Sequence, residues 1–200
     1  MDMNSRTYSM TLRGAGAHDT RRSILSAAFA LVGEKATVEI ILAEVAARAG
    51  VTVKTILRHF GSREGLFDAV TEFAIAEVAE EREAPVGDIP RAIQVIVDHY
   101  EKRGDWVIRM LAQELSDDRI HAVVEYGRTV HQTWVTTTFA PQLARVPASD
   151  RDAAVDGLIV ALDVYAWKLL RRDRGLDRDQ CEQRMRMLVE GALGEKKGEA

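Results

Sequence analysis

The sequence has few of the residues that anchor or cross-link proteins of several common classes. Its 200 residues include one cysteine, Cys181, and four prolines. A single cysteine excludes an internal disulfide and any zinc site built from several cysteines. No apolar run approaches the roughly 20 residues that cross a bilayer, and residues 1–18 lack the apolar centre of a signal peptide. We therefore expect a cytoplasmic protein that makes no use of a membrane.

Sequence motifs of enzyme active sites are also missing. The chain has no glycine-rich phosphate loop, no GxSxG, no HExxH and no Cys–His pair suited to nucleophilic catalysis. Asp117, Asp118 and His121 could be read as metal ligands, but such a turn is far more often a capped, solvated corner. The sequence predicts a protein that is not an enzyme and that has no cofactor and no metal site.

The residues that are abundant favour helices. Hydrophobic residues make up 46% of the chain and charged residues 29%, which is enough apolar material for a buried core. Alanine, leucine, arginine and glutamate are common, and aromatic residues are only 6%. This composition has high helix propensity and few strand formers. The predicted fold class is all-α.

Residues 43–67 have the pattern of two short helices joined by a tight turn. Gly50 suits the left-handed conformation in which many helices end, and Thr52 can cap the helix that follows. Ile56 and Phe60 lie four residues apart as core anchors of that second helix. A helix–turn–helix explains why its other residues face outward, because such a helix lies in a DNA major groove. The first helix carries an apolar stripe formed by Leu42, Val45, Ala46 and Ala49.

This stretch resembles the DNA-binding domain of the TetR (tetracycline-repressor-like) family of bacterial regulators. Leu57 stands where that family usually has a tyrosine that touches a DNA phosphate, and His59 replaces an aromatic residue. Ile41 stands where the family usually has a capping threonine, so Thr37 is the better cap and this helix is expected to begin early. The family pattern, roughly I-A-x-x-A-G-V-S-x-x-T-x-Y-x-Y-F-x-S-K-E-x-L, is matched by Val45, Ala46, Ala49, Gly50, Val51, Thr52, Thr55, Phe60, Ser62, Arg63, Glu64 and Leu66.

The resemblance implies which side chains contact DNA. Lys54 and Arg58 would contact guanines or phosphates, while the hydroxyls of Thr52 and Thr55 would bind phosphate or a base edge. Arg63 aligns with a family lysine at a helix N-terminus that favours a phosphate. His59 is either a phosphate contact or a packed surface histidine. The whole predicted set is Thr52, Val53, Lys54, Thr55, Leu57, Arg58, His59 and Arg63.

The distribution of charge agrees with a DNA-binding N-terminal part. The net charge of the chain is −4, but residues 1–63 carry nine basic and five acidic residues, whereas residues 64–200 have a net charge of −8. A basic region on an acidic protein is what local phosphate binding requires. We predict a flexible N-terminal arm at 1–17, whose arginines could add DNA contacts, a helix-turn-helix DNA-binding domain of three helices at 18–66, and a C-terminal helical ligand-binding and dimerisation domain at 67–200.

The most apolar predicted helix, residues 151–171, has apolar side chains on nearly all faces and must be covered on more than one side. In the TetR family the last two long helices of each subunit pair as a four-helix bundle. The resemblance therefore implies a homodimer through the last two helices, residues 151–171 and 179–193. The other predicted helices beyond the helix–turn–helix are 20–33, 63–83, 89–103, 105–115 and 119–139.

The resemblance also implies that the C-terminal domain binds a small-molecule effector. Each candidate residue could instead be an ordinary core residue. Asp163 is the most distinctive, because it lies within an apolar helix and would face a ligand, an arginine or the other subunit. The candidates that could line a cavity between helices are His99, Trp106, Met110, Tyr126, His131, Trp134, Asp163 and Tyr165.

Taken together, the sequence predicts a bacterial DNA-binding transcriptional regulator, nucleoid-associated when it is bound to DNA. It would be a ligand-responsive repressor that acts as a homodimer on a palindromic operator in double-stranded DNA. The alternative is a helical adaptor that binds proteins through its C-terminal helices and does not read DNA. The outward face of residues 52–63 is what separates the two interpretations.

Overall fold

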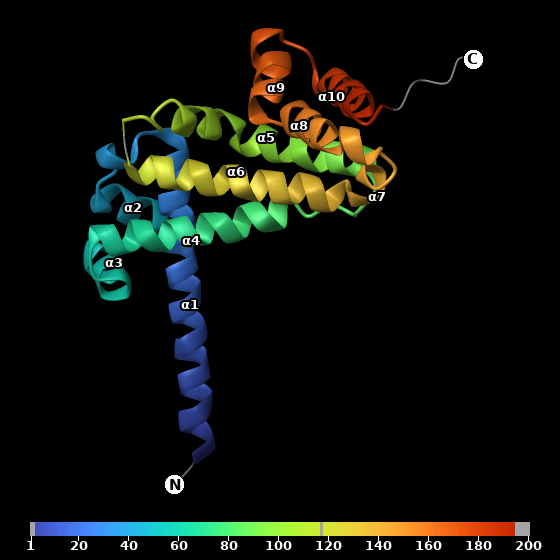
Figure 1. The fold of residues 1–200 in the computed structure, drawn as a ribbon. Coiled ribbons are helices and arrows are strands. Elements are labelled where there is room, and N and C mark those ends of the chain that lie inside the picture. Colours follow the sequence, from blue (N-terminus) through green and yellow to red (C-terminus); the bar gives the residue numbers. More distant parts are fainter. Residues whose placement is uncertain (1–2, 117, 195–200) are drawn as a thin grey trace. The chain divides into compact units, whose positions relative to one another are not determined.

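The computed structural model describes residues 3–116 and 118–194, with side chains described from His18 onward except at Arg119. Every regular element in this part of the chain is a helix (Figure 1), so the predicted all-α fold class is confirmed. The chain divides into two compact units directly after Glu77. Within the described ranges, no helix has the length and apolar content that crossing a bilayer requires.

The N-terminal unit is built around the second half of its first helix. There α1 packs against α2, and α2 packs against α3. The side chains that are fully buried in this unit come from every one of its helices and are Ile24, Ala28, Ile40, Val45, Ile56 and Leu66. The elements are α1 (Met3–Glu34), a 3-10 turn (Thr37–Glu39), α2 (Leu42–Ala49), α3 (Val53–Phe60) and α4 (Arg63–Glu81), which continues past the boundary of the unit.

The first helix is longer than the sequence predicted. The predicted helix begins at Thr20 with a side-chain cap, whereas α1 begins at Met3 and continues through Thr20 without a break. Gly14 and Gly16 weaken a helix by roughly 1 kcal/mol each but do not end it, and no proline intervenes. Residues 3–17 are thus helical in the structure, and the mobility of the predicted arm stays a prediction.

The C-terminal unit surrounds α5 with the later helices. Figure 1 shows α8 and α10 lying side by side, and both α9 and α10 pack on α5. Its largest fully buried side chains include Ile93, Ile96, Phe139, Leu158, Leu162, Trp167 and Met185. The helices of this unit are α5 (Ile89–Leu111), α6 (Asp118–Thr138), α7 (Ala140–Leu143), a 3-10 turn (Ala148–Asp150), α8 (Arg151–Ala161), α9 (Val164–Lys168), a π-helical turn (Leu169–Asp173) and α10 (Arg178–Ala192).

Gly104 does not interrupt a helix, in contrast to the sequence prediction. It lies inside the continuous helix α5 and is buried. A Cβ atom at this position would lie 2.3 Å from Cζ3 of Trp167. The glycine therefore allows the indole to pack directly on the backbone of α5, which is a tertiary requirement that the local sequence does not reveal.

The predicted helix 151–171 is in fact two helices. α8 ends at Ala161 and α9 begins at Val164, with Asp163 as its N-cap. The Asp163 carboxylate accepts a hydrogen bond from the backbone N–H of Tyr165 at 2.8 Å. The hydropathy pattern missed this break because apolar residues continue on both sides of the cap.

Candidate DNA-reading surface and ligand site

The turn between α2 and α3 is fixed by a glycine, as predicted. Gly50 has φ 67° and ψ 30°, the left-handed conformation. The backbone N–H of the next residue, Val51, donates to the carbonyl oxygen of Ala46 at 2.9 Å. A side chain at Gly50 would strain this conformation, so the residue determines how α3 leaves α2.

The helix α3, which the sequence predicts to be the recognition helix, has one buried side and one exposed side. Thr52 caps it, because its Oγ1 accepts the backbone N–H of Thr55 at 3.2 Å, and the two hydroxyl oxygens are 3.0 Å apart. Ile56 is fully buried and attaches the helix to the core. Of the predicted DNA contacts on this helix and its cap, Thr52, Lys54, Leu57 and Arg58 are exposed, whereas Val53, Thr55 and His59 are half-buried.

The start of α4 is packed tightly against the end of α3. Ser62 caps α4, because its hydroxyl accepts the backbone N–H of Gly65 at 3.0 Å. A Cβ atom at Gly65 would lie 2.3 Å from the carbonyl oxygen of Phe60. Only glycine permits this approach, and the close packing gives α3 a fixed support on its C-terminal side.

The start of α2 is capped by a residue that the sequence analysis did not select. The helix does not begin early at Thr37, which instead opens a 3-10 turn, and α2 begins at Leu42. Ile41 has no side-chain acceptor, but Glu44 Oε2 accepts the backbone N–H of Ile41 at 3.1 Å. Glu44 occupies the third helical position, as in a capping box, and this spacing could have been read from the sequence.

Arg63 is directed at the segment that precedes α2. Its Nη2 donates to the carbonyl oxygen of Thr37 at 2.6 Å, and its Nε and Nη2 each lie 3.3 Å from the carbonyl oxygen of Ile40. The guanidinium carbon lies 4.7 Å from the centre of the Phe67 ring. These contacts hold the 3-10 turn against α4, so Arg63 has a structural role beside the predicted DNA-reading surface, and its contact with a phosphate stays a prediction.

Two cations on the outward face of α3 have no partner within the part of the chain that the structure describes. Lys54 and Arg58 make neither an ion pair nor a side-chain hydrogen bond there. By contrast, Lys35 forms an ion pair with Glu44, and Arg48 forms one with Glu34. Among the described residues, the recognition helix therefore offers two positive charges without an internal partner to a polyanion.

The structure distinguishes between the two interpretations of His59. The Nε2 atom of His59 is buried without a hydrogen-bond partner, and the ring lies 6.1 Å from that of Phe60 between centroids. This arrangement favours the packed histidine over the phosphate contact. The side chains of the predicted arm at residues 3–17 are outside the part of the chain whose side chains the structure describes. Asp117, one of the three residues considered as metal ligands, is also outside the described residues.

In the C-terminal unit, several predicted ligand-site residues surround one buried arginine that the sequence analysis did not select. Arg82 is 7% exposed, and its Nη2 donates to His131 Nδ1 at 2.7 Å. A guanidinium can only donate, so His131 carries its proton on Nε2, which is 3.3 Å from the carbonyl oxygen of Ile159. Trp134 donates from Nε1 to the Arg82 carbonyl oxygen at 2.7 Å, and its ring centre lies 4.9 Å from the guanidinium carbon.

Burial determines the charge states in this cluster. Burial, and next the positive charge of Arg82, lowers the pKa of His131 to about 4. Burial also lowers the pKa of His99, although its Nδ1 donates to Glu81 Oε2 at 3.2 Å. Burial raises the pKa of the Asp163 carboxyl, which interacts with the Arg82 charge. At neutral pH both histidines are therefore uncharged.

The other predicted ligand-site residues lie elsewhere on the C-terminal helices. Trp106 and Met110 are half-buried in the second half of α5. Tyr126 on α6 is 47% exposed, and Tyr165 on α9 is 55% exposed. The two tyrosines are thus surface residues, whereas His99, His131, Trp134 and Asp163 are close enough to Arg82 to bond with it or to feel its charge.

A groove of about 780 Å³ lies between the end of α4, the following loop and α5. It shares only His99 with the predicted ligand site. Glu81 is fixed at its edge: burial raises the pKa of this carboxyl, but hydrogen bonds from His99 and Arg103 outweigh burial and bring the pKa to about 2. The groove is mainly acidic, and its charged lining residues are Glu80, Glu81, Glu83, Arg91, Asp98, Glu101 and Lys102.

Comparison with known proteins identifies the N-terminal unit. Residues 24–70 match the sequence model of the tetR family of bacterial regulatory proteins, and this range contains α2, the glycine turn, α3 and the start of α4. The chain thus carries a DNA-binding domain of the tetR family. The members of this family act by binding DNA and not by catalysis, so the prediction of a non-enzyme is confirmed by the match and the adaptor interpretation is set aside.

The fold of the chain is shared with solved structures along most of its length. A tetR-family transcriptional regulator from Streptomyces coelicolor is similar with a TM-score of 0.62 and 16% identity, over 92% of each chain. A transcriptional regulator from Rhodococcus sp. Rha1 is similar with a TM-score of 0.63 and 15% identity, over 87% of this chain and 96% of that one. At these identities the likeness establishes the fold. The comparison with curated proteins gave no significant match.

Proposed function

We propose that this TetR-family regulator is a ligand-responsive repressor that binds a palindromic operator as a homodimer. The observation that carries the DNA-binding part is the outward face of α3, on which Lys54 and Arg58 are exposed and make no internal contacts among the described residues. Cations placed in this way on a helix that follows a tight turn can enter a major groove and reach guanine edges or phosphates. Such a protein would act in the bacterial cytoplasm, at the nucleoid when DNA-bound.

The remaining contacts follow from the positions of side chains on the same helix. The Thr52 and Thr55 hydroxyls are suited to a phosphate or a base edge, and Val53 to a thymine methyl. Leu57 is 40% exposed and would add an apolar contact. We assign Arg63 the task of holding residues 37–40 in place, because three hydrogen bonds already direct its guanidinium there.

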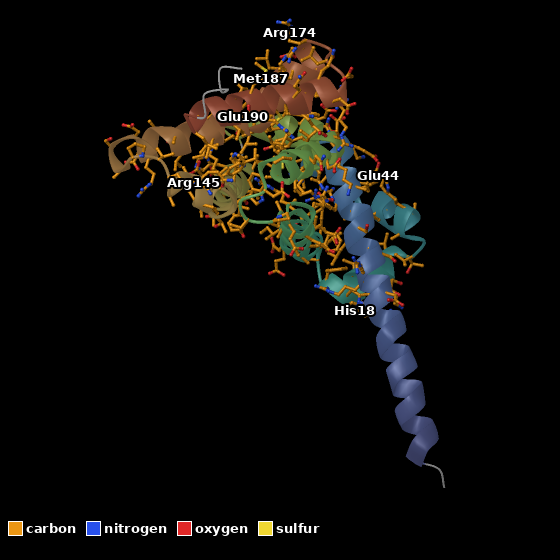
Figure 2. The ribbon with its side chains drawn as sticks, turned by 90° about the vertical axis from the view of Figure 1, so that its right-hand side faces the viewer. His18, Glu44, Arg145, Arg174, Met187 and Glu190 are labelled. Carbon is orange, nitrogen blue, oxygen red and sulfur yellow. The ribbon has the colours of Figure 1, made fainter. Side chains whose placement is uncertain are left out.

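The homodimer is supported by apolar side chains that remain exposed on α8 and α10. Val160 is 69% exposed, and Met187 and Leu188 are 49% and 50% exposed. Met187 is labelled on α10 in Figure 2. Apolar side chains gathered on neighbouring helices are typical of an interface, because water contact with them is costly. A second copy of the same face would cover them around a twofold axis.

The proposed regulatory mechanism uses α4, which begins next to the recognition helix and ends in the C-terminal unit. Effector binding in the C-terminal unit would shift the end of α4 and change the separation of the two recognition helices in the dimer. Operator half-sites have a fixed spacing, so a shift of a few Å would weaken DNA binding. Effector and DNA would then oppose each other reciprocally.

The DNA-binding part is tested with the double variant Lys54→Ala/Arg58→Ala of the full chain. Its binding to the DNA upstream of its own gene is measured by gel shift and by fluorescence anisotropy at several salt concentrations. We expect affinity to fall by roughly 30-fold or more, and the slope of log affinity against log salt to become shallower by about 2. The matched control is Arg145→Ala/Arg174→Ala, which removes the same charge from exposed positions of the C-terminal unit (Figure 2).

The control should leave both quantities nearly unchanged, because those arginines lie outside the family-matched residues. Unfolding temperatures of both double variants should stay close to that of the wild type, since all four side chains are exposed. If the Lys54→Ala/Arg58→Ala variant kept full, salt-sensitive binding, α3 would not be the reading helix.

A further inference from the structure

The buried arginine at the end of α4 has fewer charge partners than comparable arginines of the same unit. Arg103 donates to the Glu81 carboxylate from Nε at 3.1 Å and from Nη2 at 2.8 Å. Arg171 holds Glu101 in the same way, at 2.6 Å from Nε and 3.0 Å from Nη2. In both arginines one guanidinium edge binds one carboxylate, although both are more exposed than Arg82.

Arg82 departs from this pattern. Its Nε is buried and makes no hydrogen bond to any described residue, and its Nη2 donates only to the neutral His131. No carboxylate of the described residues lies within ion-pair distance, although Asp163 is near enough to interact with its charge. A buried guanidinium without a counter-ion costs several kcal/mol in general. The site therefore gains most from a ligand that supplies the missing anion.

We propose that Arg82 binds the carboxylate of a small organic monoanion, through the edge formed by Nε and Nη2, and that this anion is the effector. The proposal rests on the ligand-responsive function proposed above and names the chemistry of its ligand. His131 already contacts this edge and would yield or share Nη2, while the indole of Trp134 lies beside the guanidinium.

The residues around Arg82 favour a ligand that carries a single negative charge and is otherwise apolar. Trp134 and the buried Tyr100 are aromatic, and the Trp134 ring also contacts the Phe139 ring edge-on at 6.2 Å between centroids. One guanidinium balances one charge, whereas a phosphate dianion would bring a second charge into an apolar environment. The neutral imidazole of His131 adds no further positive charge at neutral pH.

The large groove beside α5 is the wrong place for this ligand. Its carboxylates outnumber its cations, and Glu81 and Glu101 already occupy Arg103 and Arg171. An anion would be repelled there and attracted to Arg82. The same residues explain how binding would be transmitted: Arg82 directly follows the end of α4, and Glu81, the last residue of that helix, is bonded to α5 through His99 and Arg103. Movement of Arg82 toward a ligand would act on this attachment.

The test uses the full chain with benzoate and hexanoate as probes, each compared with its neutral amide at constant ionic strength. Binding is followed by the Nε–H resonance of Arg82 in ¹H–¹⁵N spectra, assigned by its loss in Arg82→Met, and by the unfolding temperature. We expect at least one carboxylate to shift this resonance saturably and to raise the unfolding temperature by about 3 to 6 °C at roughly ten times its dissociation constant. Both amides should do neither.

Arg82→Met keeps the length of the side chain and removes its charge, so both responses should disappear in this variant. Arg145→Met, at an exposed arginine of the same unit, should respond like the wild type. Equal responses to acid and amide, a response retained in Arg82→Met, or no response to either acid would each overturn the proposal. Operator binding by the unliganded chain, measured separately, tests the proposed function, so failure of one is distinguishable from failure of the other.

Discussion

Arg63 at the start of α4 donates a hydrogen bond to the carbonyl oxygen of Thr37 at 2.6 Å, across the N-terminal end of α2. We predict that Arg63→Met lowers the free energy of unfolding by about 1–3 kcal/mol, because carbonyl groups lose a charged donor. It should weaken operator binding without changing the salt slope. Urea unfolding and salt-dependent anisotropy measure the two effects. Arg58→Met, at an exposed residue, should give the opposite result: nearly unchanged stability and a slope shallower by about 1.

The cap of the recognition helix provides a second prediction. Thr52 accepts the backbone N–H of Thr55, so Thr52→Ala should destabilise the protein by about 1 kcal/mol. Thr52→Ser keeps the acceptor oxygen and should retain most of the stability and most of the DNA affinity. Thermal unfolding of the three proteins checks this. Equal stability of the alanine and serine variants would mean that the hydroxyl does not cap α3.

Two glycines inside helices should respond to alanine in opposite directions. Gly104→Ala would place a Cβ atom 2.3 Å from the Trp167 ring and should destabilise the protein by about 1–3 kcal/mol through overpacking. Gly127 in α6 is exposed, and a Cβ atom added there would meet no atom within 4 Å beyond its chain neighbours and the adjacent backbone of its own helix, so Gly127→Ala should stabilise by about 0.5–1 kcal/mol. The free energies of unfolding of the two variants, measured in urea, test this prediction. Destabilisation of both variants by similar amounts would contradict the packing argument.

Acid should destabilise the protein partly through His131. Burial and the Arg82 charge lower its pKa in the folded state from 6.5 to about 4. Between these values the unfolded chain binds a proton that the folded chain does not, so the stabilising contribution of the neutral imidazole is lost as pH falls below about 6.5. The loss from pH 7.5 to 5 is about 2 kcal/mol for this residue.

The variant His131→Gln cannot gain a proton and should lose about that much less stability over the same pH interval. Urea unfolding at the two pH values measures the difference. His99, whose pKa is also lowered by burial, remains in the variant, so some acid sensitivity should persist. An unchanged pH dependence would mean that His131 does not titrate differently in the folded and unfolded states.

The helix–turn–helix could be predicted from the sequence because its determinants are local. Gly50 ends one helix, Thr52 caps the next, and Ile56 is the buried residue at the expected spacing. The role of Arg63 could not be predicted, since it depends on which carbonyl groups the fold brings to the start of α4. The capping role of Glu44 in α2, in contrast, could be predicted, because the residue lies at the third helical position that a capping box requires.

The C-terminal unit was harder to predict for a tertiary reason. Gly104 reads as a helix breaker, although it is the contact surface for an indole from a distant helix. Asp163 reads as a buried charge, although it caps α9. Arg82 lies within the charged run EEREA and reads as a solvated residue, although the packing of α6 buries it. In each case the sequence shows the residue type but not the residue or backbone group that it contacts in the fold.

The proposed dimer can be tested at one exposed valine of α8. Val160 is 69% exposed on α8, which packs against α10, so Val160→Lys would place a charge in the proposed interface. We expect the dissociation constant of the dimer to rise by roughly 100-fold or more, measured by sedimentation equilibrium, because a buried unpaired charge is costly. Operator affinity should fall with it. The control is Val86→Lys, the same substitution at a valine that is 58% exposed and lies outside α8 and α10. This variant should stay dimeric. A dimer that survives Val160→Lys and dissociates with Val86→Lys would move the interface away from α8 and α10.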